Sequence, residues 1–225
     1  MSSARKAPRR TAERILDHAL ALFNRYGEPN VSTTAISAEL NISPGNLYYH
    51  YPAKETLVNA LLDRYEHALA DTLARHQPAS TAPDPASHAD GVDTAWPLLP
   101  ALLRLAWDHR FIFRDLNDLL TRNRQLETRC QTALAQQTAA VRERIAALCT
   151  LDGAPLAADA ADALATSIVV LLTYWLSFEY VRDPRHALEP DNADAAITRG
   201  TRQAMALLWP YLAVAQRAGW TSRSM

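Results

Sequence analysis

Residues 32–54 read STTAISAELNISPGNLYYHYPAK, and this stretch decides the fold. Ser32 and Ser43 each stand where a side-chain oxygen can cap the first free N–H groups of a helix. Pro44 follows at the first helical position, where its missing N–H costs nothing. Asn41 suits a turn with positive φ, because Asn tolerates that conformation better than most non-glycine residues. The stretch therefore predicts two short helices joined by a tight turn, at residues 33–40 and 44–51.

A helix of about seven residues is unstable alone, so both need an apolar side that packs on neighbours. The side chains predicted to point inward are Ile36, Leu40, Ile42, Leu47 and Tyr51. The outward set combines hydroxyl groups, small residues, aromatic rings and cations, and it comprises Thr33, Thr34, Pro44, Gly45, Asn46, Tyr48, Tyr49, His50 and Lys54. A helix fits the major groove of DNA, where its first residues reach base edges and flanking hydroxyl groups and cations hold phosphates. The outward set therefore predicts a DNA-binding surface.

Several of these residues also fit a purely structural role. One of Tyr48 and Tyr49 can serve mainly to pack the helix, and His50 can be favoured simply by the dipole at a helix C-terminus. The basic segment at residues 1–10 fits a solvated arm as well as an arm that enters the minor groove. At the level of the sequence both interpretations stay open.

The segment before this stretch has the pattern of a longer helix. Between residues 11 and 26 apolar side chains recur at spacings of three and four, which predicts a helix whose inward face is formed by Ile15, Ala19, Leu22, Phe23 and Tyr26. Gly27 is predicted to end this helix with a positive φ. Residues 1–10 are predicted to lie outside it as an arm.

Composition and charge agree with a helical protein that has a basic head. The chain has 225 residues, of which 48% are hydrophobic and 21% charged, as in folded globular proteins. Only six residues are glycine, and the abundance of Ala and Leu favours helices. Residues 1–54 hold seven basic and four acidic residues, a net charge of +3, and the remainder carries −4. We call residues 1–54 the head. This charge asymmetry is expected if the head binds a polyanion, although a solvated basic tail would also produce it.

Helical patterns continue to the end of the chain. The predicted helix at 54–76 is followed by a segment rich in Pro, Ala, Ser and Asp, which predicts a loop. Beyond it, helices are predicted at residues 96–109, 111–121, 125–148, 158–181 and 191–217. The predicted fold class is all-α, with about nine helices. The predicted domains are a helix-turn-helix domain at 1–54, a connecting helix at 55–76, a loop at 77–94 and a larger helical domain at 95–225.

The segment SPGNLYYHYPAKETL, preceded by TTAISAELNI, resembles the helix-turn-helix signature of TetR-family transcriptional regulators. The resemblance covers residues 11–57 and implies that the short helix at 44–51 enters the major groove. The contacts that it implies are to the DNA backbone or bases from Thr33 and Thr34, to bases from Pro44, Gly45, Asn46 and Tyr48, and to phosphates from Tyr49, His50 and Lys54. The sequence departs from the pattern at Asn41, where the family usually has Gly. It also has Ala53 in place of a capping residue, which is expected to loosen the following helix by about 1 kcal/mol.

The same resemblance implies a helical C-terminal domain that dimerises and binds a small molecule. The family usually dimerises through its last two long helices, so the resemblance implies dimerisation through helices 158–181 and 191–217. The uncharged run at 163–178 fits this expectation, because it needs more cover than one bundle gives. This run is too short for a membrane span, and no membrane association is expected. The candidate ligand-binding residues are Trp96, Trp107, Phe111, Phe113, Leu116, Tyr174, Trp175 and Phe178. Each of these side chains also fits a packed core, and together they would suit an apolar or aromatic ligand.

The expected function is that of a cytoplasmic repressor that binds a palindromic operator as a homodimer and is released by a small effector. A helix-turn-helix regulator without a small-molecule effector, or an activator, is the alternative. The chain has no GxSxG or HExxH motif, no phosphate-binding glycine-rich loop and no metal-ligand spacing, so no enzyme, cofactor or metal is expected. Cys130 and Cys149 form no CxxC pair and are expected to be free thiols.

Overall fold

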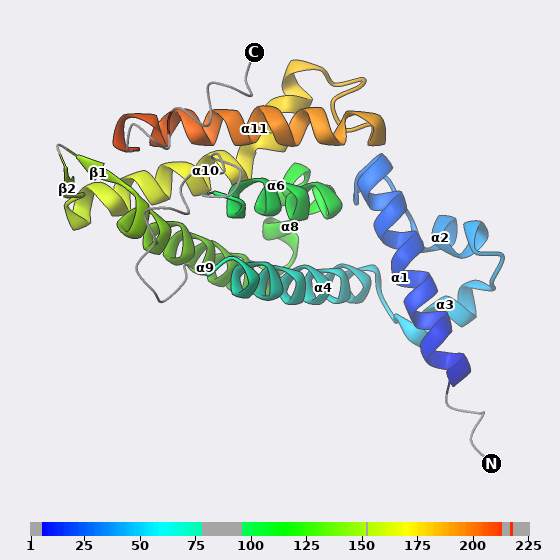
Figure 1. The fold of residues 1–225 in the computed structure, drawn as a ribbon. Helices are drawn as coiled ribbons and strands as arrows, with labels where there is room; N and C mark the ends of the chain where they lie inside the picture. Colours follow the sequence, from blue (N-terminus) through cyan, green and yellow to red (C-terminus); the bar gives the residue numbers. More distant parts are fainter. Residues whose placement is uncertain (1–5, 78–95, 152, 213–216, 218–225) are drawn as a thin grey trace. The chain divides into compact units, whose positions relative to one another are not determined.

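The computed structural model describes residues 6–77, 96–151, 153–212 and 217, with residues 6–9 as backbone only. These residues form an all-α fold, as predicted, in which the described strands are limited to two short ones (Figure 1). Contacts divide the chain into two compact units. Unit 1 contains Met1–His67 and Asp108–Arg129, and unit 2 contains Ala68–Trp107 and Cys130–Met225. Apart from Gln77, the predicted loop at 77–94 lies outside the described residues.

Three helices form the N-terminal part of unit 1, and they are α1 (Lys6–Tyr26), α2 (Thr33–Glu39) and α3 (Pro44–His50). α2 packs against both α1 and α3. The side chains that are fully buried between these helices include Ile15, Phe23, Ile36 and Leu47. Asn41 has φ 53° and Gly27 has φ 90°, which confirms the predicted turn and the predicted end of α1.

Three details of this region differ from the prediction. α1 begins at Lys6 and not at residue 11, because the earlier residues include good helix formers and Pro8 falls in the first turn, where its missing N–H is tolerated. Tyr26, which was predicted to face inward, is 49% exposed and lies beside the guanidinium of Arg25. Leu16, which was not among the predicted inward residues, is buried. Ile42 and Tyr51 are half-buried and not full members of the core.

The remainder of unit 1 comes from the first part of α4 (Lys54–Arg75), from α7 (Arg110–Arg114) and α8 (Leu116–Arg122), and from the start of α9 (Arg124–Leu148). The predicted domain boundary placed all residues after 95 in one domain, but the contacts place Asp108–Arg129 with the head. The reason is aromatic packing, since the Phe111 and Phe23 ring centroids lie 5.5 Å apart. The predicted single helix at 111–121 is interrupted at Asp115.

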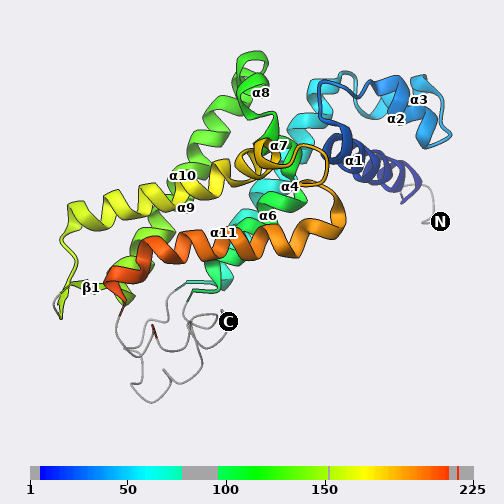
Figure 2. The same cartoon turned by 90° about the horizontal axis from the view of Figure 1, so that it is seen from above.

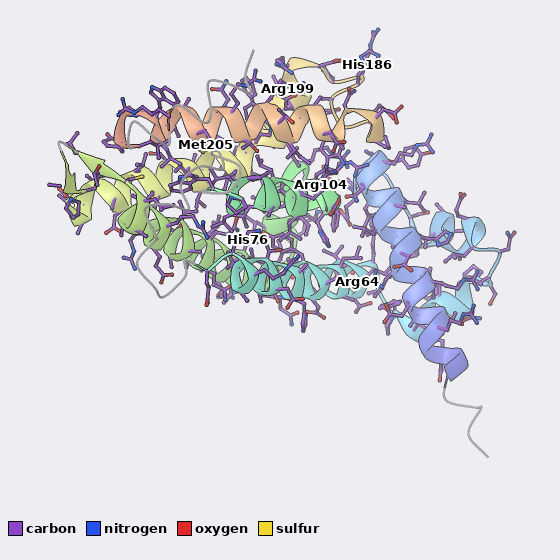
Figure 3. All side chains as sticks on the ribbon, viewed as in Figure 1. Arg64, His76, Arg104, His186, Arg199 and Met205 are labelled. Atoms are coloured by element: carbon purple, nitrogen blue, oxygen red, sulfur yellow. The ribbon has the colours of Figure 1, made fainter. Side chains whose placement is uncertain are left out.

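Unit 2 is built around α6 (Leu98–Asp108), α10 (Ala158–Arg182) and α11 (Ala193–Leu208). α10 and α11 lie side by side in both views (Figures 1 and 2). The indole N–H of Trp175 donates to the Ala196 carbonyl at 2.8 Å. A Cβ on Gly200 would lie 2.7 Å from Trp175 Nε1, so this glycine permits the close approach of the two helices. Arg104 of α6, labelled in Figure 3, forms an ion pair with Asp194 of α11.

The connections on either side of these helices are short. A hairpin of β1 (Thr150–Leu151) and β2 (Ala154–Pro155) forms at the predicted turn, with Gly153 at φ 81°. α11 follows the 3-10 turn Pro190–Asn192 and ends at Leu208, earlier than the predicted residue 217. The 3-10 turn Trp209–Tyr211 comes next, because Pro210 cannot continue the backbone hydrogen bonds of a helix.

By length and composition alone, α10 would be long and apolar enough to cross a membrane. Its side chains nevertheless serve as core, since Ile168, Leu172 and Leu176 are buried and the helix packs along α11. We therefore interpret α10 as a core helix of unit 2 that is buried on one side, whereas Val170 and Val181 on its other side are exposed.

Candidate nucleic-acid interface and a groove between two helices

α2 and α3 each begin with a serine side chain that caps the first turn of the helix. Ser32 Oγ accepts the Ala35 N–H at 3.1 Å, and Ser43 Oγ accepts the Asn46 N–H at 3.2 Å. Both serines are therefore N-caps, as the sequence predicts. With Leu47 fully buried beneath it, α3 is held in one orientation and presents its other side to solvent.

We call the outward residues of α2 and α3 the reading surface, and it comprises Thr33, Thr34, Pro44, Gly45, Asn46, Tyr48, Tyr49 and His50. The structure brings all of them to the exterior, although Thr33 and His50 are partly covered. Tyr48 is 45% exposed and Tyr49 is 79% exposed, so neither ring belongs to the core. Such large exposed rings on a helix of seven residues are unusual without a partner, and they agree with the predicted surface.

A hydrogen bond connects the two helices across this surface. Thr33 Oγ1 and the Tyr48 hydroxyl lie 2.9 Å apart, joining the start of α2 to the middle of α3. The Tyr49 and His50 rings meet edge to face, with their centroids 5.1 Å apart. The Tyr48 side chain is therefore partly ordered before any ligand binds. It loses less conformational entropy on binding than a freely rotating side chain would.

Gly45 stands in the first turn of α3 without a positive φ. A Cβ at this position would meet no heavy atom closer than Ser43 Oγ at 4.0 Å. Glycine costs helix stability relative to alanine, and here nothing within the fold requires it. The missing side chain therefore leaves room on the outer face of the helix, where another molecule can approach the backbone.

Lys54 occupies a different environment from the reading surface. Its ammonium group lies 3.0 Å from Glu28 Oε1 and donates to the Glu28 carbonyl at 2.6 Å. The Lys54 side chain is 23% exposed, and an ammonium group has three N–H donors. One donor therefore remains for a phosphate, and the predicted phosphate contact of Lys54 stays a prediction.

Glu28 is a residue that the sequence did not single out. It is 3% exposed, and its carboxylate pairs with Arg122 at 2.7 Å in addition to Lys54. Hydrogen bonds first to Glu28 and then to Asp118 raise the pKa of Arg122. Both cations lie far from Glu28 in the sequence, so their pairing with Glu28 could not be predicted. The one available signal was an acidic residue in a loop that also contains Pro and Asn.

The end of α1 is tied to α7 and α8 by further polar contacts. The Asn24 side chain donates to the Asp108 carbonyl at 2.8 Å and accepts the Phe111 N–H at 3.1 Å. Asp115, which lies at the break between α7 and α8, accepts the Glu28 N–H at 2.9 Å. These contacts anchor the segment that leads into the reading surface.

Five of the eight predicted ligand-binding residues do not line the groove that is present in unit 2. Trp96 and Trp107 are buried in unit 2, while Phe111 and Phe113 are buried in unit 1. Leu116, at the start of α8, also belongs to unit 1. The first four are therefore core side chains, whereas Leu116 is half-buried, and a ligand-binding role for these five residues stays a prediction.

The other three residues meet in a groove between α10 and α11. The groove has a volume of about 600 Å³, and its lining residues are Val170, Leu171, Tyr174, Trp175, Phe178, Arg182, Arg199, Arg202 and Gln203. The Trp175 and Phe178 rings stack with centroids 5.5 Å apart. Sequence reasoning missed the polar wall, although the spacing of Arg199, Arg202 and Gln203 places them on one side of a helix.

The polar wall of the groove is cationic. Glu179, which is 1% exposed, accepts hydrogen bonds from Arg199 Nε at 3.2 Å and from Arg182 at 2.9 Å. The bond to Glu179 raises the pKa of Arg199. Among the residues that the structure describes, no group of three or more His, Cys, Asp and Glu side chains is placed to hold a metal ion.

Sequence models of known families match both parts of the chain. Residues 15–61 match a family described as "Bacterial regulatory proteins, tetR family". Residues 64–219 match one described as "Bacterial transcriptional repressor". The first match contains the reading surface, and the second contains α10 and α11.

Individual proteins show the same likeness. The chain is 28% identical over 169 residues to an uncharacterised HTH-type transcriptional regulator in the dhlA 5' region of Xanthobacter autotrophicus, covering 72% of this chain and 74% of the relative. It is 43% identical over 61 residues to the HTH-type transcriptional regulator UidR of Escherichia coli, which is 27% of this chain and 31% of UidR. A TetR-family regulator from Marinobacter aquaeolei has a similar structure, with a TM-score of 0.78, 25% identity and coverage of 95% of this chain and 97% of that one. Salmonella enterica GusR shares the fold, with a TM-score of 0.54, 21% identity and coverage of 92% of this chain and 100% of that one.

Proposed function

The chain belongs to the TetR family of DNA-binding transcriptional regulators, which are not enzymes, and from this premise we propose that it is a repressor that binds a palindromic operator as a homodimer. The observation that carries the proposal is the reading surface. It is exposed, it is held rigidly by two capped helices, and it contains a glycine that the fold does not need. A regulator of this kind acts in the cytoplasm, where its DNA is found.

We assign the DNA contacts by position on the reading surface. Thr33 and Thr34 stand at the first turn of α2, where hydroxyl groups and free N–H groups suit the DNA backbone. The residues proposed to face base edges in the major groove are Pro44, Gly45, Asn46 and Tyr48. Those proposed to hold phosphates are Tyr49, His50 and Lys54.

Dimerisation is proposed through α10 and α11. On α10, Val170, Tyr174, Phe178 and Val181 recur at helical spacing and are each about half exposed or more. A stripe of large apolar side chains in water is typical of a surface that a partner covers. Two copies related by a two-fold axis would place their α3 helices in half-sites about 34 Å apart along the DNA, which is one helical turn.

The proposed effector is a small apolar or aromatic molecule that binds in the groove and releases the operator. Tyr174, Trp175 and Phe178 are the predicted ligand-binding residues that line the groove, and its volume lies within the range of known ligand pockets. Because Tyr174 and Phe178 also belong to the stripe proposed for dimerisation, the effector would bind at the edge of the dimer contact. α4 is the proposed coupling element, because it runs from unit 1 into unit 2 without interruption. A change in unit 2 can thereby alter the spacing of the two heads.

The proposal is tested with genomic DNA fragments that the purified protein retains. Fragments that share a palindromic sequence, protected from cleavage over two half-sites on one face of the DNA, are the expected result. The mass of the complex should correspond to two chains per palindrome. Fragments without a common sequence, or a complex that contains one chain, would contradict the proposal.

A further inference from the structure

The groove between α10 and α11 has one apolar wall and one cationic wall, and both come from residues that the structure describes. We propose that it binds a small apolar molecule that carries a carboxylate, with Arg202 and Arg199 as the groups that bind the carboxylate. This inference rests on the proposed response to an effector and deepens it by assigning the charge and the orientation of the ligand.

The apolar wall is preformed. The Trp175 ring is fixed by the bond from its indole N–H to the Ala196 carbonyl, and Phe178 stacks on it with an angle of 28° between the ring planes. Gly200 allows the backbone of α11 to approach this ring, since any side chain there would collide with it. A flat or extended apolar ligand would therefore bind against a surface that needs no rearrangement, which lowers the entropic cost of binding.

The cationic wall carries more positive charge than the protein compensates. Arg182, Arg199 and Arg202 line the groove, whereas Glu179 supplies the single carboxylate that pairs with two of them. Within the described part of the chain, no carboxylate lies within ion-pair distance of Arg202, which is exposed at the groove. A guanidinium group binds a carboxylate through two parallel hydrogen bonds, so an anionic ligand would supply the missing partner.

At a two-fold contact through this end of α10, the α10 helix of a second copy would supply no carboxylate for Arg202. The same residues of both copies meet near such an axis. Between Asp162 and Arg182, the sequence of α10 contains no acid except the buried Glu179. An isologous contact at this end of α10 therefore brings apolar and cationic side chains together, and a carboxylate between them reduces the repulsion. The ligand would then lie at the edge of the dimer contact, where it can change the geometry of the dimer.

The test compares ligands that differ in charge and little else. The full-length protein is titrated with naphthalene-2-carboxylate and with 2-naphthalenemethanol, and binding is followed by calorimetry and by the melting temperature. The carboxylate is expected to bind at least about tenfold more tightly than the alcohol, as a charge-assisted hydrogen-bond pair requires. Equal binding of the two compounds, or no binding of either, would overturn the proposal.

Variants locate the site. Arg202→Gln is expected to weaken naphthalene-2-carboxylate binding about tenfold, and Arg202→Lys should restore part of it, because the ammonium group keeps the charge but not the paired donors. Arg185→Gln, an exposed arginine outside the groove, is the matched control and should bind the carboxylate like the natural protein. If Arg202→Gln binds unchanged, the assignment is wrong.

Two further measurements separate this inference from the proposed function. Operator binding by the natural protein without any ligand tests the regulator alone, and its failure would leave the groove result intact. Sedimentation of Arg202→Gln without ligand tests whether Arg202 serves mainly in the contact between copies. A loss of the dimer together with unchanged carboxylate binding would overturn the assignment of the groove to a ligand.

Discussion

Thr33 Oγ1 lies 2.9 Å from the hydroxyl of Tyr48, so the first residue of α2 is hydrogen-bonded to a residue of α3 that lies 15 positions later. Both residues belong to the reading surface, and Tyr48 is nearly half exposed. The bond adds little to the stability of the fold because both groups can bond to water instead. We expect its main effect to be on the orientation of the Tyr48 ring in the proposed contact with DNA.

Removing either hydroxyl should therefore weaken operator binding without unfolding the protein. Tyr48→Phe and Thr33→Val are each expected to lower affinity about three- to tenfold, the range for a hydrogen bond of about 0.5–1.5 kcal/mol. The double variant should lose less than the sum of the two single variants, because both remove the same mutual bond. Fluorescence anisotropy with a labelled operator measures the three affinities. Losses that simply add would show that the two hydroxyl groups act independently.

A substitution at Gly45 should change operator affinity without lowering the stability of the fold. Gly45→Ala should leave the free energy of unfolding unchanged or raise it by up to about 1 kcal/mol, because a Cβ there meets open space. The same change should lower operator affinity about tenfold, since the added methyl would lie where we propose that the DNA approaches the helix backbone. Urea unfolding and operator titration measure the two effects.

Gly200→Ala is the contrasting control, because it is also a helical glycine but lies against Trp175 and Leu103. It should destabilise the protein by about 1–3 kcal/mol through overpacking. If Gly45→Ala bound the operator as well as the natural protein, the proposed close approach at Gly45 would be wrong.

Lys54 is predicted to have two roles that different measurements distinguish. Lys54→Ala should lower the stability by about 1–2 kcal/mol, because the buried Glu28 loses one of its two cations. It should also flatten the dependence of log affinity on log salt by about one unit, as expected for a lost phosphate contact. Arg122→Ala removes the other cation and should lower stability while leaving the salt slope unchanged. If both variants leave the slope unchanged, Lys54 serves only to hold Glu28.

The two cysteines should differ in reactivity. Burial raises the pKa of Cys149 to about 12, and the thiolate is the reactive form. At pH 8 a disulfide reagent should therefore modify Cys130, which is half-buried, much faster than Cys149, and both should react once guanidinium unfolds the protein. Equal rates in the folded protein would contradict the burial of Cys149.

The same shift links stability to alkaline pH. The folded state favours the protonated thiol, so this contribution is complete below about pH 9 and is lost as the pH rises toward the folded-state pKa. Urea unfolding at pH 8 and pH 10.5 should show a larger loss of stability for the natural protein than for Cys149→Ala. A loss of the same size in both proteins would assign the pH dependence to other groups.

Local structure was predictable where the cause is local. Ser32 and Ser43 cap the helices that follow them, and the positive φ of Asn41 and Gly27 follows from the steric freedom of those residues. The exposed side of α3 could be predicted because its buried side needs only Leu47.

Contacts between distant segments were not predictable in this way. Glu28 looks like an ordinary loop residue, and its burial depends on Lys54 and Arg122, which lie 26 and 94 positions later. For the same reason, no sequence pattern indicated that residues 108–129 would pack with the N-terminal helices. Aromatic content also could not distinguish a core residue such as Phe111 from a groove residue such as Phe178. An aromatic side chain at helical spacing suits both a packed core and the apolar wall of a groove.

The most direct test of the central claim is the binding of Tyr48→Ala to an operator recovered from genomic fragments and to unrelated DNA of equal length at the same salt concentration. The account predicts that operator affinity falls by about 1–3 kcal/mol and that the preference at particular base pairs is blurred, while binding to unrelated DNA is nearly unchanged. An equal loss on both DNAs would contradict the claim that the exposed face of α3 reads base sequence.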